Sequence, residues 1–417
     1  MAYSEHINLG ISYLLKSQNA DGGISKDCPD SKISGVWTTA ESLDAILSTE
    51  NLQFNISTLD NLILIANYLI RKFIVDDDND CGYWEIVDGE GASTMSTGHT
   101  IYALQTLSNK VLTNCDLDAI IISGKTYSIA EIKNEISECT QKGFKWLQKN
   151  QQLDNGWSYT VKTEGKQSTN LCAFYVMKGY QALGRTTQND ASMYQACLSI
   201  KERIVKLINS NNDLEISMPE VLYGFTCLHC SGYFTKSEAD FKKRIMKYIN
   251  RHWKVIKKYV TFGRAFESTG NSVKYTEYVN NMPFIALNAF LVSEEFSISR
   301  KLKKLIQYLI NNKVDGEWAI YKGEKKETTW VTAEAVLALN QAQQKFIKYE
   351  NNIIRKKREK ALTIVSCVLS AVCATFFIYY FVQQIIASDV VQALPNGLIA
   401  LLGIASSLIS IVEVFKK

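Results

Sequence analysis

The sequence predicts an all-α protein, an (α/α)6 toroid of helical hairpin repeats followed by a C-terminal pair of transmembrane helices. Three observations lead there. A helix–turn–helix pattern recurs along the chain. Only 4 of 417 residues are proline while 46% are hydrophobic, which suits long helices around a large core. A long stretch near the C-terminus carries no charge at all, as a membrane span requires.

The clearest copy of the repeat runs from Lys142 to Trp157. Trp146 and Leu147 are adjacent apolar residues of one helix, and Gln151 follows before the chain breaks at Gly156. Glycine takes the left-handed conformation at little cost, so it ends the helix, and the tryptophan after it covers the turn. The unit is therefore a helix, a glycine turn and a second helix.

The N-terminus repeats these spacings with Tyr13-Leu14, Gln18 and Gly22. Second helices are expected after the turns, in Val36–Leu47 and Gln167–Leu183, where Ser or Thr precedes or opens an apolar run. The repeat is about 45 to 55 residues long, in the range of stacked or closed helical arrays.

Six such helix pairs account for residues 1–344. We expect Ser4–Ser17 with Thr39–Ser48, Leu59–Ile74 with Thr97–Leu107, two helices within Ile129–Leu183, Ser192–Ile208 with Pro219–Cys230, Ser237–Lys258 with Asn281–Val292, and Ser299–Asn311 with Thr332–Gln344. The last unit returns to the pattern of the first, as a ring needs where its ends meet. A closed toroid is therefore expected, and an open superhelix is the alternative.

The repeat resembles that of the squalene-hopene and oxidosqualene cyclases over Tyr3–Gln344. The matching residues are Lys142, Gly143, Trp146, Leu147, Gln151, Gly156 and Trp157. The same terpene cyclase and prenyltransferase-like superfamily of toroids includes the β subunits of protein prenyltransferases and the thioester domains of complement proteins. The resemblance implies a helical toroid and, for an enzyme, isoprenoid or lipid chemistry.

The reactive signatures of those relatives are missing from the sequence. No DxDD motif occurs, and the last of the four histidines is His252, too early for the prenyltransferase zinc site. A complement-type thioester needs Cys-Gly-Glu-Gln, whereas this chain has Cys81-Gly82-Tyr83-Trp84. Cys227 and Cys230 lack a second ligand pair and fit core packing. We expect no metal site and no resident cofactor.

An acidic run contains the spacing with which terpene synthases hold magnesium and diphosphate, through Asp76, Asp77 and Asp80. It immediately precedes a glycine turn, where other units also carry an aspartate. An exposed acidic turn is therefore the competing interpretation, and magnesium enters only if the chain is an isoprenoid enzyme.

Superposing the units brings four ionisable residues to one position near the start of each second helix: Glu41, His99, Glu220 and Glu334. Equivalent positions of a closed ring converge, so these groups are candidates for acid–base catalysis or for binding a cation, an amine or a basic peptide. The competing interpretation is helix capping, because Thr38 and Ser217 each precede a glutamate by three residues.

The character of the chain changes after residue 344. A basic linker helix is expected over 345–360, and a membrane hairpin over 361–417. The first span, Ala361–Ile386, has 26 residues without a charge, and a bilayer core needs about 20. The second, Leu398–Val412, spans only with a proline-kinked extension, so a re-entrant or interfacial helix is the alternative.

The distribution of basic residues predicts the topology. They crowd the start of the first span and end the chain, and the loop Ser388–Asn396 has none, so the toroid and both termini are expected on the cytoplasmic side of a bacterial inner membrane. The ten cysteines show no disulfide framework, in line with a reducing compartment. Small residues at Ala400, Gly403 and Ser407 favour homo-oligomerisation of the hairpin.

These observations led us to hypothesise a membrane-anchored, non-catalytic toroid that acts as a sensor or effector by binding a ligand or protein. The aromatic content favours an apolar or isoprenoid ligand, or a peptide, in its lumen. The alternative is a membrane-associated isoprenoid- or lipid-modifying enzyme. A net charge of +4, with 46 basic and 42 acidic residues, argues against nucleic acid as a partner.

Overall fold

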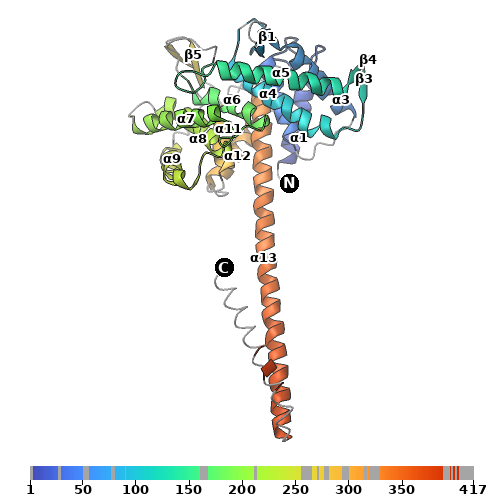
Figure 1. The fold of residues 1–417 in the computed structure, drawn as a ribbon, viewed down its shortest axis with the longest axis vertical. Helices are drawn as coiled ribbons and strands as arrows, with labels where there is room; N and C mark the ends of the chain where they lie inside the picture. The colour runs from blue at the N-terminus through green and yellow to red at the C-terminus, as the bar shows by residue number, and fades with distance from the viewer. Residues whose placement is uncertain are drawn as a thin grey trace. The chain divides into compact units, whose positions relative to one another are not determined.

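The computed structural model describes most of the chain. The described residues are 3–26, 30–49, 56–76, 80–89, 91–159, 168–210, 214–254, 265–269, 272–276, 281–293, 300–313, 317–318, 329–387, 395, 398–399 and 402. The chain divides into two compact units, Met1–Gln343 and Gln344–Lys417. The first unit is built almost entirely from helices that alternate between an inner and an outer layer (Figure 1).

The inner helices pack against one another in chain order, α2 on α4, α4 on α6, α6 on α8 and α8 on α11. They are α2 (Val36–Leu47), α4 (Thr94–Lys110), α6 (Asn170–Ala182), α8 (Leu214–Cys230), α11 (Asn281–Val292) and the start of α13 (Thr329–Ile386). Every residue of α2 except the half-buried Trp37 is buried. A helix that is enclosed on all sides in this way belongs to the interior of the ring.

The outer helices are amphipathic. They are α1 (Ser4–Lys16), α3 (Ile56–Arg71), α5 (Ile129–Lys149), α7 (Ala191–Asn209), α9 (Ala239–Arg251) and α12 (Arg300–Asn311). In α9 the buried side chains are Ile245, Tyr248 and Ile249, a single stripe along an otherwise basic helix. Such a stripe covers one side of the inner layer and leaves the charges in water.

Strands are confined to short antiparallel hairpins in the described part of the chain. β1 (Ile74–Asp76) pairs with β2 (Cys81–Tyr83), β3 (Ala119–Ile122) with β4 (Lys125–Ser128), and β5 (Ala265–Thr269) with β6 (Ser272–Thr276). Two short 3-10 turns, Leu112–Asn114 and Lys236–Glu238, complete the elements. The expected all-α toroid is therefore confirmed, with hairpins decorating its loops.

The first and last units meet, which closes the ring. Thr329 Oγ1, at the start of α13, donates to the carbonyl of Ser25 at 2.6 Å. Farther along α13, the Asn340 side chain donates to Ser48 at the end of α2. A Cβ added at Gly10 of α1 would lie 2.4 Å from Val336 Cγ2, so only glycine fits between α1 and α13. The open superhelix considered from the sequence is not what forms.

The tryptophan of the repeat fastens each turn to the helix before it. Trp84, Trp157 and Trp318 are fully buried. Their Nε1 atoms donate to the carbonyls of Leu69 at 2.7 Å, Leu147 at 2.9 Å and Leu309 at 2.8 Å. Each acceptor lies two residues before the end of an outer helix, where helical carbonyls have no partner of their own. The repeat motif is thus a C-terminal cap made by an indole.

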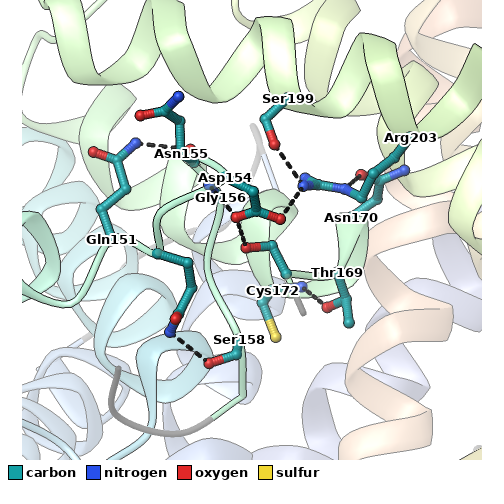
Figure 2. Close-up of polar contacts among 12 residues, drawn as sticks. Gln151, Asp154, Asn155, Gly156, Ser158, Thr169, Asn170, Cys172, Ser199 and Arg203 are labelled. Atoms are coloured by element: carbon teal, nitrogen blue, oxygen red, sulfur yellow. Dashed lines mark hydrogen bonds and ion pairs between the residues drawn. The ribbon is translucent and has the colours of Figure 1, made fainter. Parts of the chain in front are cut away.

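Polar residues also hold the turn that follows α5 (Figure 2). Asp154 Oδ1 accepts from the backbone N–H of Gly156 at 3.1 Å and from the Ser168 hydroxyl at 2.5 Å. Arg203 of α7 approaches Asp154 Oδ2 at 3.4 Å and donates from Nε to Asn170 Oδ1 at 2.8 Å. The turn after α5 is therefore joined both to the start of α6 and to α7.

The second compact unit contains most of α13, which continues without a break to Ile386. Its segment Thr329–Tyr380 contains a window apolar enough to cross a membrane, with mean hydropathy 2.3 and only 6% of that window buried. Apolar side chains such as Leu362 and Phe376 are exposed there. The second expected span, Leu398–Val412, lies largely outside the described residues, so one candidate span is seen where the sequence predicted a pair.

Candidate functional site

Three charged or ionisable side chains from three inner helices meet in the interior of the ring. Lys178 of α6 donates from Nζ to Asp44 Oδ2 of α2 at 2.5 Å. His99 Nε2 of α4 lies 3.3 Å from the same oxygen. Asp44 is 3% exposed and His99 1%, so both are almost entirely withdrawn from water, while the Lys178 side chain keeps 19% of its surface exposed.

The electrostatics of this trio keep Asp44 ionised and His99 neutral. Burial opposes the charge on Asp44, but the Lys178 ammonium and the His99 contact outweigh burial and lower its pKa to about 2. Burial lowers the pKa of His99 to about 4, against the raising effect of Asp44. Burial likewise opposes the charge on Lys178, yet Asp44 raises its pKa above the usual value. At neutral pH the trio is an ion pair with an uncharged imidazole.

A pair of glutamates joins this trio. Glu41 lies one turn before Asp44 on α2, and Glu334 lies on α13. Burial and then the neighbouring Glu334 raise the pKa of Glu41 well above its ordinary value. Burial raises the pKa of Glu334 to about 8, although Lys178 opposes the rise. Two carboxyl groups that repel each other in this way are both shifted towards their protonated forms.

The pair also carries oxygen atoms that the protein leaves unused. Among the described residues, Oε2 of Glu41 and Oε2 of Glu334 have no hydrogen-bond partner, and neither does Nδ1 of His99. Buried polar atoms are nearly always paired, so unpartnered oxygens on two interacting carboxyl groups suggest a group that comes from outside.

Aromatic rings surround the polar cluster. The Trp37 ring lies 5.0 Å from that of His99 and 4.6 Å from that of Tyr175, both edge-on. The Lys178 ammonium lies 4.2 Å from the Tyr102 ring centroid. Tyr223 of α8 completes this set, and burial raises its pKa well above the ordinary value. The interior therefore combines flat apolar faces with proton-carrying groups.

Two glycines let the helices bearing His99 and Lys178 approach closely. A Cβ added at Gly98 would lie 2.5 Å from the Cα of Val176, and one at Gly179 would lie 2.6 Å from the carbonyl oxygen of Gly98. These glycines are the immediate neighbours of His99 and Lys178, so the backbone contact of α4 with α6 sets the positions of both side chains.

The sequence predicted that four residues at equivalent positions of the repeat would converge, and the structure brings three of them together. Glu41, His99 and Glu334 belong to the cluster described here. Glu220 instead accepts the backbone N–H of Asn170 at 2.6 Å and so caps the start of α6. Capping was thus the right interpretation for Glu220, although the helix capped is the neighbouring one.

Helix capping does not explain Glu41. The residue before α2 is Gly35, which offers no side-chain cap, and Glu41 sits in the second turn rather than the first. For the second proposed capping box, the Ser217 side chain lies outside the described residues.

Sequence reasoning missed Asp44, Lys178, Trp37 and Tyr175. The signals were present: Trp37, Glu41 and Asp44 recur at helical spacing on one face of α2, and Lys178 is the one charged residue in the apolar run of α6.

The acidic run that contains Asp76, Asp77 and Asp80 is not part of this cluster. Asp76 ends β1 and Asp80 occupies the turn before β2, where it pairs with Lys145 at 2.6 Å and remains largely exposed. Asp77 lies outside the described residues. Within the described part of the chain, no group of three His, Cys, Asp or Glu side chains is arranged to hold a metal ion.

Comparison with known proteins identifies the fold. No family model matches the sequence, and no curated protein resembles it. Among solved structures, the chain is similar to a cellobiose 2-epimerase from Bacillus thermoamylovorans, with 12% identity, a TM-score of 0.55, and coverage of 82% of this chain and 99% of that one. It is also similar to the α-1,6-mannanase GH76A of a Salegentibacter species, with 10% identity, a TM-score of 0.50, and 82% and 99% coverage.

These likenesses establish an (α/α)6 toroid, and a specific tie to the terpene cyclases is not among them. They also correct the function expected from the sequence. We hypothesised a non-catalytic sensor, with an isoprenoid enzyme as the alternative, whereas the toroids that share this fold are enzymes that act on carbohydrates. The sequence lacks the signatures of the terpene cyclases, and that absence is no test of catalysis.

Proposed function

We propose that this protein is a carbohydrate-active enzyme that moves a proton on a reducing sugar, as an epimerase or isomerase does. The observation that carries the proposal is the cluster on the inner helices, in which a buried neutral histidine and the Glu41–Glu334 pair lie around the Asp44–Lys178 ion pair. Pairs of groups whose surroundings push their pKa values apart are typical of acid–base catalysis. The fold, shared with a cellobiose 2-epimerase, supports the same class of substrate.

In this proposal His99 is the general base. Its Nε2–H donates to Asp44, which fixes the tautomer and leaves the lone pair of Nδ1 free to accept a proton. Glu334, together with Glu41, supplies the acid, because a carboxyl group with a pKa of about 8 still carries its proton at pH 7. Asp44 is a positioning residue and Lys178 holds it ionised. Trp37 and Tyr175 offer faces on which a sugar ring packs.

Deuterium exchange tests this assignment. The full-length protein in mild detergent is incubated with reducing mono- and disaccharides in D2O, and proton NMR follows the loss of the C2 hydrogen signal. We expect exchange with the native protein and at least a hundredfold slower exchange with His99→Gln or Glu334→Gln. Glu138→Gln, which alters an exposed α5 residue paired with Lys142, is the matched control. Exchange at the native rate in His99→Gln would refute the role of the histidine.

A second candidate function is hydrolysis of a glycosidic bond, favoured by the presence of several carboxyl groups in one buried cluster. In that reaction Glu334 would protonate the leaving oxygen and His99 would be dispensable. Release of reducing ends from oligosaccharides, lost in Glu334→Gln but retained in His99→Gln, separates hydrolysis from epimerisation.

We further propose that the apolar part of α13 anchors the toroid in the bilayer as the first helix of a hairpin. Exposed apolar side chains along 361–386 and the basic residues of 345–360 support it. The toroid and both termini then lie on the cytoplasmic side, and the hairpin offers a surface for self-association. Labelling of a cysteine introduced at Asn396, accessible from outside the cell only, is the expected result. Labelling from the cytoplasm would reverse the topology.

A further inference from the structure

The Glu41–Glu334 pair has no cation of its own among the described residues. Glu41 is 1% exposed, and one oxygen of each carboxyl group lacks a hydrogen-bond partner in the described structure. Lys178 is the nearest basic residue in the cluster, but its ammonium is already bound to Asp44 at 2.5 Å and lies over the Tyr102 ring. The pair therefore leaves two carboxyl oxygens without a donor, while the neighbouring ammonium is committed to Asp44.

The groups that lie near the pair come from the inner helices α2, α6 and α8. Trp37 donates a side-chain hydrogen bond to Glu41. Tyr175 and Tyr223 both lie within electrostatic reach of the two carboxyl groups. Their π faces attract cations, most strongly where water is excluded. The charged groups on these helices, Asp44 and Lys178, neutralise each other, and His99 is uncharged.

We propose that Glu41 and Glu334 bind the protonated amine of an amino sugar, so that the preferred substrate carries a free ammonium group. This inference rests on the proposed function, since it names the substrate class of the same site. A primary ammonium offers three donors, enough to reach both unpartnered oxygens, whereas a sugar hydroxyl offers one. A metal ion is a poorer fit, because no third carboxylate, histidine or cysteine completes a ligand set among the described residues.

Proton release upon binding distinguishes an amine from a neutral sugar. An ammonium ion entering beside this carboxyl pair stabilises one ionised carboxylate and drives that proton into the buffer, which leaves one proton on the pair for the acid step. Isothermal titration calorimetry in buffers of different ionisation enthalpy measures this release. The probes are a 2-amino-hexose, the parent hexose and the N-acetylated amino-hexose, each titrated into the full chain in detergent at pH 7.

We expect the amino-hexose to bind at least tenfold more tightly than the other two sugars and to be the one probe that releases protons. Glu334→Gln is expected to remove both the preference and the release. Glu41→Gln serves as a second variant in case the first fails to fold, and thermal melting checks the folding of each. Glu138→Gln, on the outer surface, is expected to leave both quantities unchanged.

The outcomes separate the two proposals. Equal binding of all three sugars without proton release overturns the amine inference and leaves the proposed function standing. Proton release that persists in both glutamine variants overturns the assignment to this pair. If no sugar binds and none is turned over, the proposed function itself is wrong.

Discussion

His99 Nε2 lies 3.3 Å from Asp44 Oδ2 although the two residues belong to different hairpins, 55 positions apart in sequence. The same oxygen accepts the Lys178 ammonium from a third hairpin. One carboxylate thus organises three inner helices, and its removal has consequences for both stability and chemistry.

We expect Asp44→Asn to destabilise the toroid by about 3 kcal/mol or more, because it leaves the Lys178 ammonium, on a side chain only 19% exposed, without its partner. Denaturant unfolding measures the loss. The matched control is Asp80→Asn, which removes an aspartate from an exposed ion pair with Lys145 and is expected to leave the unfolding midpoint unchanged. Adding Lys178→Met to Asp44→Asn is expected to restore part of the loss. No restoration would contradict the unpaired-charge explanation.

The pKa of Glu334 predicts that stability falls as the pH rises through neutrality. Its pKa is about 8 in the folded chain against 4.5 for an ordinary glutamate, so the folded state binds more protons between these values. The stabilisation is complete below about pH 4.5 and is lost as the pH approaches 8.

The contribution of His99 to stability has the opposite pH dependence, because it increases as the pH rises from about 4 to 6.5. Its folded pKa is about 4 against 6.5, so its contribution is lost as the pH falls from 6.5 towards 4. Between pH 6.5 and 8 the histidine does not change its charge, so this window reports on the Glu41–Glu334 pair. Thermal melting across that window is expected to show a decline that disappears in Glu334→Gln, and a decline of the same size in the variant would contradict the assignment.

Gly98→Ala is expected to inactivate the protein even where the chain still folds. The new methyl group would lie 2.5 Å from the backbone of α6, so α4 and α6 must separate and His99 moves away from Asp44. The comparison is Gly184→Ala, at an open turn with a φ of 73°, which strains the backbone locally and leaves the cluster intact. Activity measured per folded molecule should fall in Gly98→Ala alone.

Trp→Phe changes test the indole caps. At Trp84, Trp157 and Trp318 the substitution keeps most of the ring but removes one buried hydrogen bond, so each is expected to cost about 1 to 3 kcal/mol. The three losses should be similar, because the acceptor carbonyl occupies the same place in each unit. Calorimetric melting of the single variants measures them. A negligible loss at all three positions would show that these bonds contribute little.

The sequence predicted the ring well, because hydrophobic periodicity and turn glycines are local signals. The repeat centred on Trp157 and the likeness of the first and last units pointed to a closed toroid without any knowledge of contacts. The site was predicted only in part. Superposing repeats located Glu41, His99 and Glu334, since equivalent positions in a ring converge.

The superposition could not reveal Asp44 and Lys178, because their roles arise from a contact between hairpins with no counterpart in other units. It also could not tell Glu220 from the others. Glu220 occupies the equivalent position, but its carboxylate accepts from the backbone N–H of Asn170 at the start of α6. That contact depends on the neighbouring helix and could not be inferred from the residues around Glu220. The function was misjudged for a related reason: signatures of one family were treated as a test for catalysis in general.

The indole caps bear on how such a ring can evolve. Trp84, Trp157 and Trp318 each bond within their own hairpin, so a duplicated hairpin inherits its own fastening and needs no new partner to form it. Each of these hairpins therefore contains both partners of its own indole cap. The polar cluster belongs to no single hairpin, because its side chains come from α2, α4, α6 and α13 and meet only when the ring is closed. Adding or removing one hairpin would therefore preserve foldable parts while taking the polar cluster apart, which ties the number of repeats to the cluster rather than to stability.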